Sequence, residues 1–266
     1  MVDSFKAKVS GPRSLDGEVA VITGGGHGIG AATAIRLAQD GARIAIWDTD
    51  IEAAQRTLGL LSSTDGRHIA IEADVSDSDA VASATSRTVE ALGPIGVLIN
   101  NAGVVKSRTL WETTDEDWQT ILAVNLGGQF RCCRAIVPGM ITRRAGSIVN
   151  ISSISALNGR RQAGAAYTAS KGGVIALTYA LAAEAADYNI RVNCICPGTI
   201  LTGVHTDFTK SDLESLLSTI LLRRDEHSLN AGRAEDVAEL AWFLASPASS
   251  WITGTVIPVS GGQVFR

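Results

Sequence analysis

Short apolar runs alternate along this chain with longer stretches that are amphipathic or rich in alanine. The apolar runs predict buried strands at residues 18–23, 42–48, 67–75, 96–103, 146–153, 190–198 and 255–262. The stretches between them predict helices, among them 51–63, 77–92, 115–142 and 167–188. Continuous apolar strands separated by helices are typical of a parallel sheet covered on both faces. We therefore expect an α/β fold with a doubly wound parallel sheet of about seven strands.

The alternation runs on without a linker, an internal repeat or a low-complexity segment. We therefore expect one domain over residues 15–266, preceded by a flexible tail at residues 1–14 that lacks the apolar stretch of a secretory signal. In open parallel sheets, ligands bind beyond the carboxyl ends of the strands. The chemically distinctive residues of this chain follow its predicted strands, so the functional site is expected there.

Composition narrows the function classes. With 45% hydrophobic and 19% charged residues the chain can bury a sizeable core, which excludes intrinsic disorder. The net charge of −4 argues against a nucleic-acid partner, and no apolar run is long enough for a membrane span. The cysteines lack metal-site spacing, so we expect no metal and four reduced, mostly buried thiols in a cytoplasmic protein: Cys132, Cys133, Cys194 and Cys196.

A glycine-rich turn, TGGGHGIG at residues 23–30, lies between the first strand and a helix. Gly24 permits a tight turn, Gly28 lets the backbone approach a pyrophosphate, and Gly30 lets the helix pack close to the strand. The helix N-terminus then offers N–H groups and a partial positive charge to phosphates. The strand and helix that flank the turn favour a nucleotide site over an ordinary turn.

The second strand ends in Asp48, whose carboxylate can accept hydrogen bonds from both hydroxyls of an adenosine ribose. It would repel a 2′-phosphate, because two like charges about 4 Å apart cost roughly 4 kcal/mol at an effective dielectric of 20. No basic residue follows at Thr49, and a neutral His27 would be a poor phosphate clamp. These residues predict NAD rather than NADP as the cofactor.

Two further strand ends carry candidate nucleotide contacts. Asp74 could accept the adenine amino group while Val75 packs on the ring, although a strand-end cap explains Asp74 equally well. In the sequence NNAG, the small residues at 102–103 would let a nucleotide lie across the sheet edge, whereas Asn100 could simply tie neighbouring strands together.

The reactive candidates are Tyr167 and Lys171, which lie four residues apart on one helical face and can point into one cleft. A tyrosine is a sluggish base because its ordinary pKa is near 10, and a nearby cation favours the phenolate and lowers that pKa. The alternative is a core tyrosine beside a surface lysine.

Hydroxyl and amide groups near this pair extend the candidate site. Ser153 closes the fifth strand and could orient a substrate oxygen toward the tyrosine. Ser152 points to the opposite face if the strand continues to it, and Ser155 is a competitor if the strand runs on. Asn125 could expose a backbone carbonyl that holds a water beside Lys171, or it could be a satisfied asparagine of the helix interior.

Taken together, these motifs resemble the short-chain dehydrogenase/reductase superfamily. The resemblance extends from about Leu15 to Gly262 and rests on TGGGHGIG at 23–30, Asp48, DV at 74–75, NNAG at 100–103, VN at 124–125, ISS at 151–153, YTASK at 167–171 and PGTILT at 197–202. Each motif is unspecific alone, but eight in the correct order are very specific. The segment between Ser153 and Tyr167 is one residue longer than in many relatives.

The resemblance implies a single-domain Rossmann-type oxidoreductase that exchanges hydride between NAD and a secondary alcohol or ketone. It implies a tetrad in which Tyr167 is the general acid/base, Ser153 stabilises the substrate oxygen, Lys171 lowers the tyrosine pKa and binds the nicotinamide ribose, and Asn125 sustains a water relay. The cofactor contacts implied are Gly24, His27, Gly28, Ile29, Gly30, Asp48, Asp74, Val75, Asn101, Ala102, Gly103, Tyr167, Lys171, Pro197, Gly198, Ile200 and Thr202.

The segment 203–230 is the part least constrained by motifs. Five apolar residues form one helical stripe that fits either a lid over the substrate or fixed core packing: Leu213, Leu216, Leu217, Ile220 and Leu221. Arg160 and Arg161 lie between the candidate serine and tyrosine, where a solvated loop is the first interpretation and attraction of an anionic substrate the second.

The 167–188 helix carries small residues on several faces, which permits close contact between subunits. The resemblance implies a homotetramer formed through this helix and its predecessor. Three functions compete: an NAD-dependent dehydrogenase of alcohols, polyols or hydroxy acids, an NADP-dependent carbonyl or 3-oxoacyl-carrier-protein reductase, and a non-catalytic sensor of NAD. Asp48 argues against the second, and the presence of both Tyr167 and Lys171 argues against the third.

Overall fold

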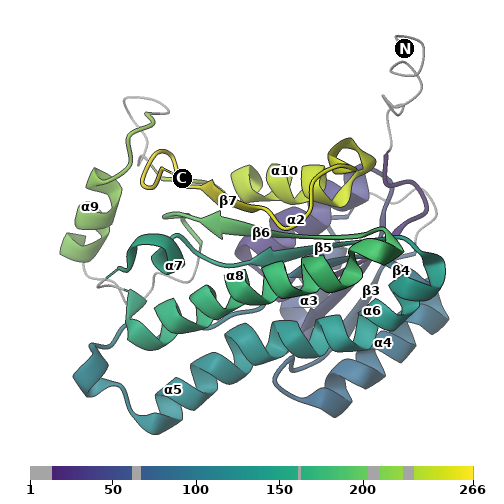
Figure 1. Cartoon of the computed structure of the whole chain (residues 1–266), viewed down its shortest axis with the longest axis horizontal. Coiled ribbons are helices and arrows are strands. Elements are labelled where there is room, and N and C mark those ends of the chain that lie inside the picture. Colours follow the sequence, from purple (N-terminus) through teal and green to yellow (C-terminus); the bar gives the residue numbers. More distant parts are fainter. Residues whose placement is uncertain (1–13, 62–66, 161–162, 203–209, 224–230, 266) are drawn as a thin grey trace.

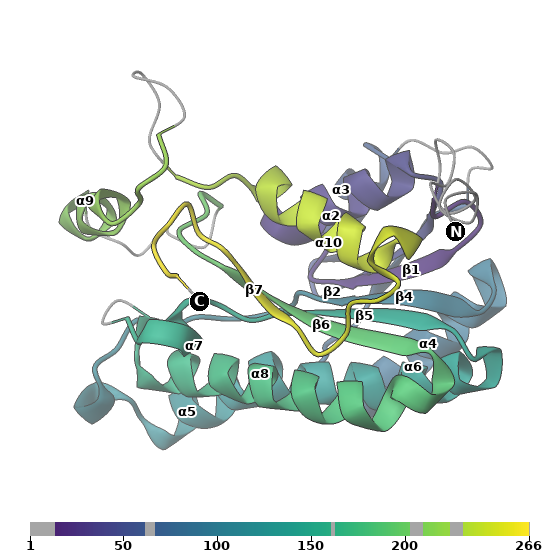
Figure 2. The same ribbon diagram turned by 45° about the horizontal axis from the view of Figure 1, so that its top comes forward.

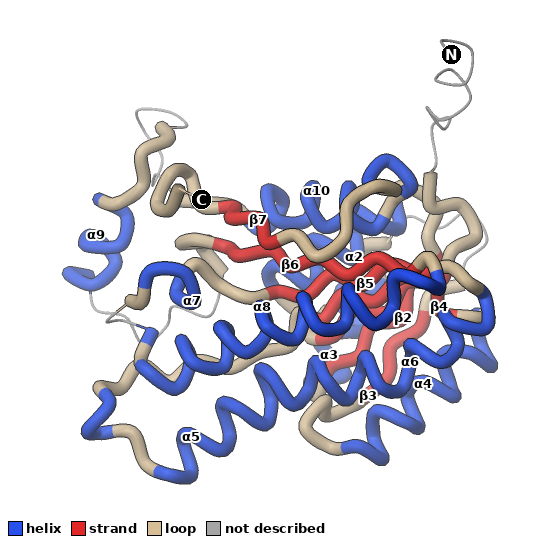
Figure 3. Tube along the Cα trace, viewed as in Figure 1, coloured by secondary structure: helices blue, strands red, loops and turns tan. Residues whose placement is uncertain are grey.

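The computed structural model describes residues 14–61, 67–160, 163–202, 210–223 and 231–265. The predicted tail at 1–14 lies outside this part of the chain except for Ser14. Figure 1 shows a central sheet with helices on both sides, and Figure 3 shows the strands as one continuous layer.

The sheet has seven parallel strands in the order β3-β2-β1-β4-β5-β6-β7. This confirms the predicted α/β fold class. The strands are β1 (Val19–Thr23), β2 (Arg43–Asp48), β3 (Ile69–Glu72), β4 (Ile95–Asn100), β5 (Gly146–Ile151), β6 (Ile190–Pro197) and β7 (Val256–Val259). The order reverses between β1 and β4, and this topological switch point is where parallel sheets bind ligands.

Two helical layers cover the sheet, as Figure 2 shows. One layer contains α2 (Gly28–Gln39), α3 (Ile51–Leu58) and α10 (Ala234–Ala245). The other contains α4 (Ser78–Leu92), α5 (Asp115–Leu122), α6 (Gln129–Arg143) and α8 (Ala165–Ala185). Successive side chains of a strand face opposite layers. In β1, for example, Ala20 and Ile22 pack toward α2 and α10, whereas Val19 and Val21 pack toward α4, α6 and α8.

Several predicted boundaries are wrong by a few residues. The strand predicted at 67–75 is only Ile69–Glu72, and the helix predicted at 51–63 ends at Leu58. The strands predicted to end at Gly103 and Ser153 leave the sheet at Asn100 and Ile151. In each of these two strands the residues that follow the last strand position line a pocket.

The long helix predicted at 115–142 is three segments, because a π-helical turn at Ala123–Gly128 joins α5 to α6. Its two glycines have low helix propensity, and such turns are frequent at functional sites. All four cysteines are unpaired and buried, as predicted. Within the described ranges, no helix combines the length and hydropathy that a membrane span needs, and no group of three metal-ligating side chains is present.

Candidate functional site

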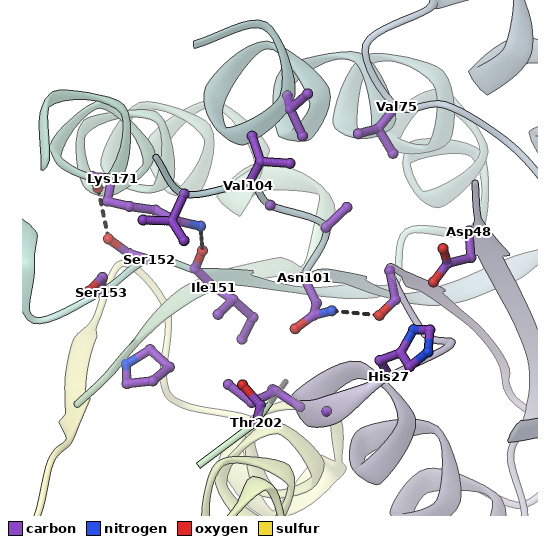
Figure 4. A pocket seen from close by; sticks show the side chains of 18 of the residues that line it. His27, Asp48, Val75, Asn101, Val104, Ile151, Ser152, Ser153, Lys171 and Thr202 are labelled. Carbon is purple, nitrogen blue, oxygen red and sulfur yellow. Dashed lines mark hydrogen bonds between the residues drawn. The ribbon is translucent and has the colours of Figure 1, made fainter. Parts of the chain in front are cut away.

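A pocket of about 920 Å³ lies across the carboxyl ends of the strands at the switch point. Its wall includes residues that follow β1, β2, β3, β4, β5 and β6, together with two residues of α8 (Figure 4). A volume of this size fits the range of small-molecule and cofactor sites. Every predicted cofactor contact lines it except Gly30, and of the predicted tetrad it brings together Ser153, Tyr167 and Lys171.

The glycine turn between β1 and α2 forms one end of the pocket. Gly28 adopts a left-handed φ of 51°, and a side chain there would press on Thr202 at 3.0 Å. A Cβ at Gly30 would clash with the carbonyl of Gly24, which explains why Gly30 packs behind the turn rather than lining the pocket. The N-cap residue His27 makes no side-chain cap, so the first N–H groups of α2 face the pocket with their partial positive charge. This cradle fits a dinucleotide pyrophosphate.

Asp48 lies at the end of β2 on the same side of the pocket as His27 (Figure 4). Its Oδ2 accepts a hydrogen bond from the Gly26 amide at 2.8 Å, and its Oδ1 accepts one from the Asp50 amide at 3.0 Å. A Cβ at Gly26 would lie 2.9 Å from Oδ2, so glycine is needed for this close approach. The carboxylate is therefore held in one orientation before any ligand arrives.

The predicted adenine contacts are Asp74 and Val75. The exposed Asp74 accepts a hydrogen bond from the Ser76 amide through Oδ1 at 2.8 Å, which is the strand-end cap left open above. Val75 is 6% exposed and packs against Gly128 of the π-helical turn, where a Cβ would be only 2.6 Å away. Both residues line the pocket, and their contacts with an adenine stay a prediction.

The NNAG turn contributes both to the pairing of strands and to the pocket wall. Asn100 donates to Asn150 Oδ1 at 2.9 Å and so ties β4 to β5. The amide of Asn101 donates to the carbonyls of Thr23 and Gly24, both at 2.9 Å, so this side chain holds the glycine turn (Figure 4). Gly103 lies so close to the reactive end that its Cβ would be 3.4 Å from Lys171 Nζ.

At the reactive end, Ser153 and Tyr167 line the same pocket, and the Ser153 hydroxyl acts to lower the pKa of the Tyr167 phenol. Lys171 Nζ donates to the carbonyl of Ile151 at 2.9 Å and lies 5.7 Å from the centroid of the tyrosine ring. The predicted competitor Ser155 is buried away from the pocket, and its amide donates to Ser153 Oγ at 3.1 Å. The geometry therefore brings Ser153, not Ser155, to the tyrosine.

Ser152 was expected on the opposite face if the strand continued to it, but β5 ends at Ile151, so this condition is not met. Ser152 lines the pocket, and its hydroxyl donates to the Lys171 carbonyl at 2.7 Å, which anchors the first turns of α8 (Figure 4).

Asn125 is fully buried in the π-helical turn and does not line the pocket. Its Oδ1 accepts from the Val104 amide at 2.8 Å, and its Nδ2 donates to the Val104 carbonyl at 2.9 Å and to Ser170 Oγ at 3.1 Å. The side chain thus clamps the loop after β4 to α8. A relay water at its backbone carbonyl stays a prediction.

The charges at the reactive end differ from the expectation. Burial lowers the pKa of the Lys171 ammonium to about 8, with Cys194 and Cys196 acting in the opposite direction. Burial also raises the pKa of the Tyr167 phenol, and the hydrogen bond with Ser153 only partly offsets this. Lys171 donates to the Ile151 carbonyl and not to the phenol, and a lowering of the phenol pKa by the ammonium stays a prediction.

A stability experiment follows from the buried lysine. Its pKa is about 8 in the folded chain against 10.5 for an ordinary lysine, so the unfolded chain binds the extra proton between these values and stability rises with pH. Lys171→Met removes this dependence. We expect the stability of the variant relative to wild type to fall by about 2 kcal/mol between pH 7 and pH 9.5, measured by urea unfolding of both proteins.

The buried thiols of Cys132 and Cys133 have raised pKa values in both proteins. Their contribution to the pH dependence of stability is therefore removed when the two proteins are compared. Parallel stability curves for wild type and variant would mean that Lys171 is not desolvated in the folded chain.

The end of β6 and the loop after it form another wall of the pocket. Pro197, Gly198, Ile200 and Thr202 line the wall, and Ile200 pairs with Gly232 in an isolated bridge. This loop therefore connects the pocket with the segment that leads into α10.

The candidate lid is described only in part, because 203–209, 224–230 and the side chain of Leu213 lie outside the described residues. The helix α9 (Lys210–Ser218) ends before the predicted stripe does. Leu216 and Ile220 are buried, whereas Leu221 is 61% exposed, so the stripe does not extend to it. Whether α9 moves stays a prediction.

Arg160 is not the solvated loop residue of the first interpretation. It is half-buried and donates to the hydroxyls of Thr199 at 3.1 Å and Thr219 at 3.4 Å. Arg161 lies outside the described residues.

Sequence reasoning missed several parts of the site. The Thr23 hydroxyl accepts from the amides of Asn101 and Ala102, both at 3.0 Å, and its place at the end of β1 was the available signal. The missed lining residues are mostly apolar. Val124 and Ile151 lie within the motifs VN and ISS without having been named as site residues, and no motif marked the others: Trp47, Thr49, Ala73, Val104 and Val105.

Comparison with known proteins gives consistent matches over nearly the whole chain. Residues 24–263 match the family described as Enoyl-(Acyl carrier protein) reductase. The chain is 38% identical over 251 residues to the 3-oxoacyl-(acyl-carrier-protein) reductase of Thermotoga maritima, which covers 94% of this chain and 99% of that protein. It is 37% identical over 251 residues to the galactitol 2-dehydrogenase (L-tagatose-forming) of Cereibacter sphaeroides, and this match covers 93% of this chain and 95% of that protein.

Solved structures agree with these matches. A short-chain alcohol dehydrogenase from Sinorhizobium meliloti superposes with a TM-score of 0.87 at 37% identity, covering 94% of this chain and 97% of the other. Levodione reductase superposes with a TM-score of 0.86 at 31% identity, covering 94% and 98%.

Proposed function

The chain belongs to the short-chain dehydrogenase/reductase superfamily and is an NAD(P)-dependent oxidoreductase acting on CH–OH groups. From this premise we propose that it interconverts a secondary alcohol, such as a polyol or hydroxy acid, and its ketone with NAD. The observation that carries the proposal is one pocket with a held carboxylate, Asp48, at one end and the Ser153–Tyr167–Lys171 group at the other.

When bound, the nicotinamide supplies hydride exchange with the carbinol carbon. In the oxidation direction, Tyr167 accepts the proton of the substrate hydroxyl while Ser153 hydrogen-bonds the same oxygen. In reduction, Tyr167 returns that proton. Lys171 places its ammonium in the same pocket and would bind the nicotinamide ribose. Asn125 fixes the loop that contains Val104, which also lines the pocket.

Preference for NAD is supported by the charges of the wall. Among the described lining residues the one lysine or arginine is Lys171, at the far end from Asp48, so no guanidinium or ammonium is present to neutralise a 2′-phosphate. The galactitol dehydrogenase relative supports the polyol class.

The second candidate is an NADP-dependent reduction of 3-oxoacyl thioesters. It is favoured by the identity of 38% with the 3-oxoacyl-(acyl-carrier-protein) reductase of Thermotoga maritima, which slightly exceeds the 37% with galactitol 2-dehydrogenase.

A spectrophotometric screen separates the two candidates. Secondary alcohols, polyols and hydroxy acids are tested with NAD and with NADP, and acetoacetyl-CoA is tested with NADH and NADPH, at 340 nm. We expect alcohol-dependent reduction of NAD. Turnover confined to acetoacetyl-CoA with NADPH would establish the second candidate, and no turnover with any pair would refute both.

We also propose a cytoplasmic homotetramer that folds as a single domain from residue 15 onward and has no nucleic-acid partner. The small residues of α8 support the assembly, since Ala169, Ala176, Ala180 and Ala183 are exposed along this helix. A monomeric mass by light scattering at micromolar concentration would contradict it.

A further inference from the structure

Four segments of the chain meet at two threonine hydroxyls beside the substrate end of the pocket. We call this cluster the threonine node; it consists of Arg160, Thr199, Thr219 and Gln263. Gln263 is its centre. The Oε1 atom of Gln263 accepts from the Thr199 amide at 2.8 Å, and Nε2 donates to the hydroxyls of Thr199 at 3.2 Å and Thr219 at 2.7 Å.

Arg160 reaches the same two hydroxyls from the connection between β5 and α8. Within the described part of the chain, no carboxylate forms an ion pair with this guanidinium. Each threonine oxygen therefore accepts from both Arg160 and Gln263, and the two donors share their acceptors.

The node is coupled directly to the pocket wall. Thr199 lies between Gly198 and Ile200, which both line the pocket. A Cβ at Gly198 would clash with Gln263 Oε1, so the side chain of Gln263 packs directly against this wall residue. Displacing Gln263 would thus change the support of the wall that faces the substrate.

The threonine node is also hydrogen-bonded to the end of α9. Gln263 Nε2 donates to the Leu216 carbonyl at 3.2 Å, and the amides of Leu221 and Leu222 donate to the Gly261 carbonyl at 2.9 and 3.0 Å. Figures 1 and 2 both show α9 beside the C-terminal segment that follows β7. The last turn of α9 and the loop after β6 are thus tied to one C-terminal side chain.

We propose that Gln263 is a positioning residue that, together with Arg160, fixes the Gly198–Ile200 wall and the end of α9 in the arrangement that binds substrate. The inference rests on the proposed function, in which the alcohol or ketone occupies this end of the pocket. Because Gly198 and Ile200 are also among the implied cofactor contacts, the node acts at the end of the pocket where nicotinamide and substrate would meet, and not at the glycine turn.

The first experiment measures steady-state kinetics with the best alcohol of the screen. Gln263→Ala and Arg160→Met each raise KM about threefold, because each loses hydrogen bonds to neutral groups. Since the two donors share their acceptors, the double variant raises KM by at least about threefold more than the product of the two single increases. The value of kcat stays within about twofold of wild type. The matched controls Gln55→Ala and Arg87→Met, both at exposed positions, leave KM unchanged.

Thr219 supplies a conservative pair of variants. Thr219→Ser keeps the acceptor hydroxyl and retains the wild-type KM, whereas the isosteric Thr219→Val raises KM as Gln263→Ala does. A merely structural role would lower the melting temperature without this split between serine and valine. Equal KM values for Ser and Val, or strictly multiplicative effects of the first two variants, would overturn the proposal.

A second experiment does not need turnover. Hydrogen exchange of residues 214–222 accelerates at least about tenfold in Gln263→Ala, while β4 and β5 keep their protection. If no alcohol or ketone is turned over, the proposed function fails, and the exchange result still decides whether the node holds α9. Unchanged exchange in this segment would overturn the node itself.

Discussion

Replacing Tyr167 with phenylalanine is expected to lower kcat at least about a thousandfold, because a positioned acid or base contributes typically 10²- to 10⁴-fold and no other described titratable side chain at this end of the pocket holds the Ser153 hydroxyl. The ring and its packing are retained, so NADH binding should change little. The measurement is kcat with the best alcohol of the screen, alongside a fluorescence titration of NADH.

Tyr179→Phe is the matched control, since Tyr179 lies on the same helix but is 52% exposed and far from the pocket wall. It should retain wild-type turnover. Near-normal kcat in Tyr167→Phe would remove the phenol from the mechanism and with it the proposed proton transfer.

The pH profile adds a test of the same phenol. Because burial raises its pKa in the structure, oxidation of the alcohol should accelerate as pH rises, and a bound positively charged ring and Lys171 must together lower that pKa for rapid turnover near neutrality. The profile of kcat/KM against pH reports this value in the free enzyme. A profile that falls as pH rises from 6 to 9 would contradict a phenolate base.

The sequence was sufficient to predict the layer architecture and most of the site, and the reason is geometrical. Parallel strands bring their carboxyl ends to one edge, so residues such as Asp48, Asn101 and Ser153 had to line one edge of the sheet once the strands were recognised. Hydrophobic alternation shows where a strand passes, but it does not show at which residue the strand ends. The face of Ser152 therefore depended on whether the strand continued to it.

Contacts that depend on tertiary packing could not be predicted. Gln263 reaches Thr199 across 64 positions of sequence, and although Thr199 lies within the PGTILT motif, no motif marks Gln263. Burial raises the pKa of the Tyr167 phenol, and Lys171 Nζ donates to the Ile151 carbonyl. Spacing of four residues on a helix predicts proximity, not which acceptor the ammonium selects.

Asp48→Ala is expected to shift the preference for NAD over NADP by about thirtyfold or more. A 2′-phosphate about 4 Å from the carboxylate would be repelled by roughly 4 kcal/mol at an effective dielectric of 20, and half of this after solvent relaxation corresponds to about thirtyfold. The variant should also bind NAD more weakly, because the acceptor for the ribose hydroxyls is lost. The measurements are the dissociation constants of both dinucleotides and the ratio of their kcat/KM values.

Two further variants separate charge from hydrogen bonding. Asp48→Asn keeps an acceptor for the Gly26 amide but removes the charge, so it should recover NADP binding while losing less NAD affinity than alanine. Glu52→Ala removes an exposed carboxylate of the neighbouring α3 that does not line the pocket, and it should leave both constants unchanged. If the preference stays the same in both Asp48 variants, the carboxylate held by the glycine turn does not select the cofactor, and discrimination must come from the steric fit of the wall around Thr49.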